Sequence, residues 1–269
     1  MDQTGVLTHR MDGAGKPVLL LNGGMMSIAS WDAIAGPLAA RYRVLRCDFR
    51  GQLCSPGAPP ADLLGHVADV VALLDALDVG RTNVIATSFG AEVGLLLAAT
   101  HPGRITSLVA ATATDVATSA LRDGGRLGRA CSIAASGGDR TRLLEMLELI
   151  LYSEAYIAAH RKELAERAAQ IAQLPGQWFS GAADLLASLE NLDLRPYLGS
   201  ITCPVLVVVA GEDRVMPLER SRALASAVHG ARVEVVEGSG HALVVERPEE
   251  FTQICLRFLE RNGAQGGLK

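Results

Sequence analysis

The stretch VIATSFGAEVGLLLAATHP, residues 84–102, places one serine between two segments of different pattern. The residues before Ser88 are apolar or β-branched, as in a buried strand, and the residues after it carry apolar side chains typical of a helix that stops at Pro102. Ala86 and Gly90, two positions to either side of Ser88, are both small. Small residues there let a strand and a helix approach closely around a sharp turn. The pattern predicts either a serine held outward as a nucleophile or an ordinary turn.

Short apolar runs rich in Val, Leu and Ile recur along the chain and alternate with helical patterns. We expect buried strands at 17–23, 42–49, 82–88, 105–113, 203–213 and 232–238. We expect helices at 31–42, 62–79, 89–102, 218–230 and 247–263. This alternation predicts an α/β fold with a doubly wound, mostly parallel sheet, to which residues 5–13 add an antiparallel edge strand.

The alternation stops between residues 115 and 198, where only helical patterns occur. We therefore expect residues 1–114 and 199–269 to form the core and residues 115–198 to form a helical insertion. Ligands of open α/β sheets bind outside the carboxyl ends of the strands. A helical insertion at that edge is well placed to act as a lid (cap) over a ligand site.

Two polar residues after later strands form a chemical pattern with Ser88. Asp213 ends the run 203–213, and His241 lies in the loop after the run 232–238. A serine hydroxyl needs a base to act as a nucleophile, and the base needs a carboxylate to orient it. The order Ser88, Asp213, His241 along the chain is the one expected when the nucleophile sits on a strand-to-helix turn. The sequence predicts that these three residues form a catalytic triad.

Each of these residues also has a purely structural interpretation. Asp213 could cap the following helix, and His241 could pack within its loop. Glu212 and Asp115 also lie near strand ends and are alternatives to Asp213 as the acid. Three such residues at the ends of three strands, in this order, favour the catalytic interpretation.

The bulk composition narrows the function classes. A chain of 269 residues that is 49% hydrophobic can bury a large core. The formal net charge is −4, and charges of both signs are interspersed, which disfavours a nucleic-acid partner. Five cysteines without a C-x-x-C pair indicate small buried thiols in a reducing compartment.

The sequence contains no motif for a metal or a cofactor, so we expect neither. The apolar runs are too short for a membrane span, and the first residues lack the apolar region of a signal peptide. We expect a cytoplasmic protein. The oligomeric state is left open.

The chain resembles the α/β-hydrolase superfamily over nearly its whole length. LLLNGGMMSIASW, 19–31, is similar to the family's H-G loop, with Asn22 in place of the usual His. DFRGQLCSP, 48–56, is similar to its D-x-R-G-x-G-x-S loop, with Leu53 in place of the second Gly. The segments around Asp213 and His241 look most like those of enol-lactonases and related carboxylesterases. The resemblance implies the α/β-hydrolase fold and a lidded serine hydrolase.

An oxyanion hole and a pocket complete the expected site. The backbone N–H of Phe89 lies at a helix start, and Gly24 lets the backbone approach a substrate, so these two N–H groups are expected to hold the oxyanion. Met25 is the next candidate donor. The residues expected to line an apolar substrate pocket are Asn22, Met25, Met26, Met146, Trp178, Phe179 and Leu243.

The function expected from these features is hydrolysis of a carboxylic ester-type bond (ester, lactone or thioester) through an acyl-enzyme on Ser88. The substrate would be a small, apolar molecule. An acyltransferase could use the same three residues, with an alcohol in place of water. A non-catalytic protein of the same fold is the other alternative.

Overall fold

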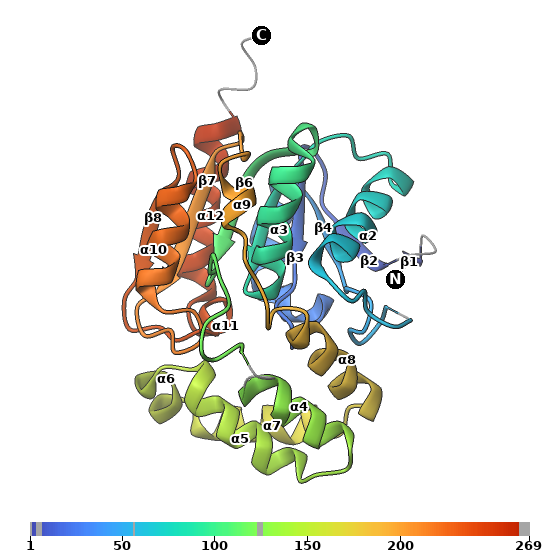
Figure 1. Cartoon of the computed structure of the whole chain (residues 1–269), viewed down its shortest axis with the longest axis vertical. Coiled ribbons are helices and arrows are strands. Elements are labelled where there is room, and N and C mark those ends of the chain that lie inside the picture. Colours follow the sequence, from blue (N-terminus) through green and yellow to red (C-terminus); the bar gives the residue numbers. More distant parts are fainter. Residues whose placement is uncertain (1, 4–6, 56, 123–125, 264–269) are drawn as a thin grey trace.

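The computed structural model describes residues 2–3, 7–55, 57–122 and 126–263 (Figure 1). An eight-stranded sheet with the order β1-β2-β4-β3-β5-β6-β7-β8 forms its centre. The strands are β1 (Asp2–Gln3), β2 (Thr8–Asp12), β3 (Pro17–Leu21), β4 (Arg43–Cys47), β5 (Thr82–Thr87), β6 (Ile105–Ala111), β7 (Val205–Ala210) and β8 (Arg232–Val236). The pairs from β4–β3 to β7–β8 are parallel, and β2 pairs antiparallel with β1 and β4.

The predicted doubly wound, mostly parallel sheet is confirmed. Of the edge strand expected at 5–13, residues 8–12 form β2, while residues 5 and 6 lie outside the described residues. The six expected parallel strands all occur, although several are shorter than their apolar runs. β3, for example, ends at Leu21, because Asn22 leaves the ladder to begin a loop.

Both faces of the sheet are buried, which explains the continuous apolar runs. Leu19 and Leu21 of β3 pack in one hydrophobic core, and Val18 and Leu20 pack in the other. The first core is covered by α2 (Leu63–Ala76), α3 (Phe89–Thr100), α9 (Arg195–Leu198) and α10 (Leu218–Ala227). The second is covered by α1 (Asp32–Ala39), α11 (Leu243–Glu246) and α12 (Pro248–Gly263). Two short 3-10 helices, η1 (Ile28–Trp31) and η2 (Pro102–Arg104), precede α1 and β6.

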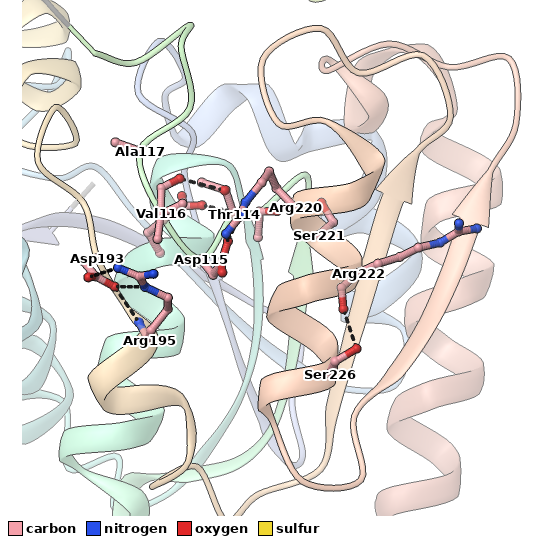
Figure 2. Close-up of polar contacts among 12 residues, drawn as sticks. Thr114, Asp115, Val116, Ala117, Asp193, Arg195, Arg220, Ser221, Arg222 and Ser226 are labelled. Carbon is pink, nitrogen blue, oxygen red and sulfur yellow. Dashed lines mark hydrogen bonds and ion pairs between the residues drawn. The ribbon is translucent and has the colours of Figure 1, made fainter.

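Between β6 and β7, where the sequence predicts a helical insertion, five helices precede α9 in the described residues. They are α4 (Arg126–Ala135), α5 (Arg140–Leu151), α6 (Glu154–Ala159), α7 (Arg161–Ala172) and α8 (Gly176–Ala187). Figure 1 shows them gathered at one end of the sheet, in green to yellow. The chain enters and leaves this segment at one point, because Val116 and Asp193 form a β-bridge (Figure 2).

The helical segment α4–α8 rests directly on the loop after β4. A Cβ added at Gly181 of α8 would lie 1.8 Å from the carbonyl oxygen of Gly51, so only glycine fits at this crossing. Leu185 and Leu186 of the same helix join the core under α2 and α3. In the part of the chain described here, each helix is too short or too polar to cross a membrane.

Candidate active site

Ser88 lies on a strained turn between β5 and α3. Its φ of 50° and ψ of −128° are unfavourable for a residue with a side chain and cost on the order of 1–3 kcal/mol. The turn is held from both sides, since the Ser88 N–H donates to the Ala111 carbonyl of β6 at 2.9 Å and the Ser88 carbonyl accepts from the Ala91 N–H at 2.6 Å. This geometry presents the serine side chain at the carboxyl edge of the sheet.

The small residues around Ser88 have a direct structural reason. A Cβ at Gly90 would lie 2.5 Å from the carbonyl oxygens of Leu21 and Asn22 at the end of β3. Ala86 faces Gly94 of α3, where an added Cβ would lie 3.5 Å from that of Ala86. The start of α3 can therefore pack against the sheet only if these side chains stay small.

The structure brings the hydroxyl of Ser88, the ring of His241 and the carboxylate of Asp213 into one hydrogen-bonded chain. Nε2 of His241 lies 3.0 Å from Oγ of Ser88, and Nδ1 lies 3.0 and 2.9 Å from the two carboxylate oxygens of Asp213. Oδ1 of Asp213 also accepts the N–H groups of Val215 and Met216, at 2.8 and 2.7 Å. These donors fix the carboxylate, which in turn fixes the plane of the imidazole.

The alternative acids lie elsewhere. Asp115 is buried and forms an ion pair with Arg220 of α10, whose Nε donates to Oδ1 at 3.0 Å (Figure 2). The side chain of Glu212 is exposed to solvent. Neither carboxylate contacts His241 in this structure.

The two N–H groups expected to hold an oxyanion lie on adjacent segments. Phe89 is the first residue of α3, so its N–H has no acceptor within the helix. A Cβ at Gly23 would lie 3.6 Å from Cβ of Ser88, and one at Gly24 would lie 3.9 Å from Cβ of Phe89, which places the Gly23–Gly24 loop beside the serine turn. Two neighbouring segments thus present backbone groups near the Ser88 hydroxyl.

A buried polar network holds the Gly23–Gly24 loop. One of its members, Gln52, was not predicted from the sequence. Nε2 of Gln52 donates to the carbonyl of Gly23 at 2.8 Å, and Oε1 accepts from Asn22 Nδ2 at 2.9 Å. Asn22 also donates to Asp48 and accepts from the indole N–H of Trp31 at 2.7 Å. Gln52 lies within the DFRGQLCSP segment, which is the only sequence cue to its role.

A cavity of about 130 Å³ opens at Ser88 and His241. Three of the expected pocket residues, Met25, Met26 and Trp178, line it. The helical segment supplies most of its other apolar walls, through Leu144, Leu147, Leu164, Ile171 and Leu186. Glu148, Tyr152 and Arg167 of the same segment also line it and were not expected.

The other four expected pocket residues lie away from the cavity. Asn22 is fully buried within the network described above. Met146 is 58% exposed on the outer side of α5. Phe179 packs edge-on against Trp178 and under the guanidinium of Arg140, and Leu243 is buried in the core beneath α12. The pocket prediction is wrong for Asn22 because its side chain is bonded within the buried network, and wrong for the other three because only one face of each helix reaches the cavity.

A second missed residue, Glu246, supports the loop that carries His241. Oε1 of Glu246 accepts the N–H of Gly240 at 2.9 Å, and both carboxylate oxygens bind Ser153 between α5 and α6. The N–H of Ala242 donates to the carbonyl of Leu151 at 2.8 Å. The histidine loop is therefore fastened to the helical segment on both sides of His241.

The cysteines take no part in this site. All five are free thiols, and burial raises the pKa of Cys131 to about 12 and that of Cys203 to about 11. The described residues contain no group of three or more His, Cys, Asp or Glu side chains that could hold a metal ion.

Comparison with known proteins identifies the class. Residues 16–248 match the alpha/beta hydrolase fold family, so the chain belongs to that family. Among curated proteins, it is 32% identical over 258 residues to a protein of Variovorax paradoxus (strain S110) named "Putative carbamate hydrolase RutD", with 94% of each chain covered. The family and this relative support hydrolase activity.

Two solved structures share the fold. MGS-M2, an alpha/beta hydrolase enzyme from a Medee basin deep-sea metagenome library, has a TM-score of 0.88 at 24% identity and covers 94% of both chains. The enol-lactonase from Burkholderia xenovorans LB400 has a TM-score of 0.83 at 24% identity and covers 94% of this chain and 96% of its own. At this identity the two structures establish the fold alone.

Proposed function

We propose that this protein is a serine hydrolase that cleaves a carboxylic ester-type bond through an acyl-enzyme on Ser88. The observation that carries the proposal is the 3.0 Å contact between His241 Nε2 and Ser88 Oγ, combined with the bonds of His241 Nδ1 to Asp213. A serine next to an oriented imidazole is activated as a nucleophile.

The proposed reaction has two halves. As Ser88 Oγ bonds to the carbonyl carbon, His241 accepts the hydroxyl proton, and the N–H groups of Phe89 and Gly24 bind the oxygen that becomes negative. Collapse of the tetrahedral intermediate breaks the bond to the leaving group, which takes the proton from His241. Water then attacks the acyl-enzyme with His241 again as the base, and Ser88 regains its proton as the acid product leaves.

The cavity favours a small substrate. Its volume of about 130 Å³ is close to the roughly 150 Å³ of an engineered apolar cavity that binds benzene. The helical segment supplies most of the cavity walls, so residues 115–198 would act as a lid over the site. A lid that excludes water would strengthen the hydrogen bonds to the oxyanion.

A carbamate is the second candidate substrate. The curated relative carries that activity in its name, and a carbamate has the same acyl carbonyl that Ser88 would attack. Ser88, His241 and Asp213 would act on an ester and on a carbamate alike. The two reactions would differ in the group left on Ser88, an acyl group from the ester and a carbamoyl group from the carbamate.

Hydrolysis of p-nitrophenyl acetate, p-nitrophenyl butyrate and a p-nitrophenyl carbamate tests the proposal. Ser88→Ala should lower kcat/KM by at least about a thousandfold with an unchanged circular dichroism spectrum. Ser226→Ala, which removes an exposed hydroxyl of α10 (Figure 2), should leave it unchanged. Equal rates for the Ser88→Ala variant and the wild type would refute the proposal. The product ratio with added alcohols separates hydrolysis from acyl transfer.

A further inference from the structure

Arg167 of α7 lies where two hollows meet. It lines the cavity at Ser88, and it also lines an outer hollow of about 530 Å³ between α7 and the core. Val244 and Val245, which follow His241, are the other two residues that line both. Arg167 is therefore part of the boundary between the cavity and the outer hollow.

This cation has no carboxylate partner among the described residues. Arg167 is half-buried, and it forms neither an ion pair nor a side-chain hydrogen bond with that part of the chain. Glu166, its neighbour on α7, pairs instead with Lys162 at 3.8 Å. A partly desolvated guanidinium with free donors is a strong site for a planar anion, because two parallel N–H groups match the two oxygens of a carboxylate.

A phenol lies beside the same cation. Tyr152 lines the cavity and is buried, and the positive charge of Arg167 acts on it and on Tyr156, which stacks against it. The hydroxyl of Tyr152 can add a neutral donor to the guanidinium. The remaining wall residues of this part of the cavity, such as Leu164 and Ile171, are apolar.

Acidic side chains also occur around this cation, and none of those in the described residues pairs with it. Glu148 lines the cavity, and burial and the neighbouring Glu145 raise the pKa of its carboxyl. The buried carboxylate of Glu246 also acts on Tyr152, but it is bonded to Ser153 and Gly240. Glu163 and Glu166 lie on the exposed side of α7, in the outer hollow, where water and salt screen their charge.

We propose that Arg167 binds a free carboxylate of the substrate, so that this site selects small ester-type molecules that carry a carboxylate remote from the scissile bond. The proposal rests on the proposed function, with Ser88 at the reacting carbonyl. It replaces the expectation of a wholly apolar substrate with one of an apolar middle and an anionic end.

The test uses the monomethyl esters of succinate, glutarate and adipate. Each is paired with a neutral methyl ester in which a methyl ketone of the same length replaces the free carboxylate. In at least one pair, the wild type should show a kcat/KM about 10–100 times higher for the anionic ester. Arg167→Met should bring the ratio of the two kcat/KM values within each pair close to one. Arg161→Met, an exposed charge on the same helix, and Glu148→Gln should keep the preference for the anionic ester.

Binding measured without turnover separates this proposal from the proposed function. Calorimetric titration of the Ser88→Ala variant with each pair should show tighter binding of the anionic ester, and adding Arg167→Met should abolish the difference. Equal affinities within all three pairs, or a preference that survives Arg167→Met, would overturn the role of Arg167 even if Ser88 proves to be the nucleophile. If the anionic ester binds through Arg167 but Ser88 proves not to be the nucleophile, the role of Arg167 is supported and the proposed function is wrong.

Discussion

Glu246 and Ser153 are joined by two hydrogen bonds: the Ser153 N–H donates to Oε1 at 2.9 Å, and the Ser153 hydroxyl donates to Oε2 at 2.7 Å. Oε1 also accepts the N–H of Gly240, the residue before His241. Glu246 is buried, so these bonds are shielded from water. One carboxylate thus couples the position of the histidine loop to that of the helical segment.

Replacing this carboxylate should destabilise the protein. Glu246→Gln puts an amide NH₂ where an oxygen accepts hydrogen bonds, which leaves at least one buried donor unpaired. We expect the free energy of unfolding to fall by on the order of 1–3 kcal/mol, and kcat for ester hydrolysis to fall because His241 loses its support. Urea unfolding and steady-state assays measure both. Glu250→Gln, an exposed acid on α12, is the control, and the same effect in both variants would contradict the role of Glu246.

Gln52 should affect the rate of reaction more than substrate binding. Its amide holds the carbonyl of Gly23, whose neighbour Gly24 supplies a proposed oxyanion donor. Gln52→Leu keeps the bulk but removes this bond, so the donor is less well positioned in the transition state. We expect kcat to fall by up to about 10²-fold with little change in KM. A rise in KM at constant kcat would argue against positioning of the oxyanion loop.

Glu92 should make stability depend on pH. Burial, together with the charge of Asp213, raises the pKa of this carboxyl from 4.5 to about 8, although it accepts one hydrogen bond from the Thr114 N–H. Between these pH values the folded state binds the proton and the unfolded chain releases it. The contribution of Glu92 to stability therefore falls as pH rises through this range.

Glu92→Gln removes that dependence. The free energy of unfolding of the variant, relative to the wild type, should increase by a few kcal/mol between about pH 5 and pH 8. Denaturant unfolding at several pH values gives the comparison. Parallel curves for the two proteins would show that Glu92 ionises in the folded state as it does in the unfolded chain.

Two glycine substitutions should have opposite signs. Gly90→Ala places a methyl group 2.5 Å from two carbonyl oxygens of the β3 end, so the start of α3 must shift, at a cost of about 3 kcal/mol or more. Gly128→Ala lies in α4, where the added group would make an ordinary van der Waals contact of 3.8 Å with Cβ of Leu186, and it should stabilise the protein by up to about 1 kcal/mol. Thermal unfolding measures both. A neutral effect of Gly90→Ala would mean that strand and helix are less tightly packed there.

The sequence was informative where chemistry and backbone geometry depend on a local pattern. The strand-to-helix turn at Ser88 demands small neighbours, and Asp213 and His241 follow apolar runs, so their meeting at one edge of the sheet was predictable. The alternation of strands and helices likewise predicted the parallel sheet. Each of these features follows from a pattern of residues that lie close together in the chain.

Residues that act through distant contacts were not predictable in this way. Glu246 reaches Ser153, 93 positions away in the chain, and no local pattern marks that pair. Met146 and Arg167 both lie on helices with one polar and one apolar face, yet only Arg167 reaches the cavity. The face that a helix turns toward a ligand depends on its packing against other helices, which its own sequence does not specify.

The most direct measurement is mass spectrometry after reaction with a fluorophosphonate, which modifies only a serine activated by a neighbouring base. We predict a single adduct, mapped by proteolysis to the peptide that contains Ser88, absent from Ser88→Ala and strongly slowed in His241→Ala. A folded wild-type protein that takes up no label, or an adduct on a different serine, would contradict the role assigned to Ser88 and His241.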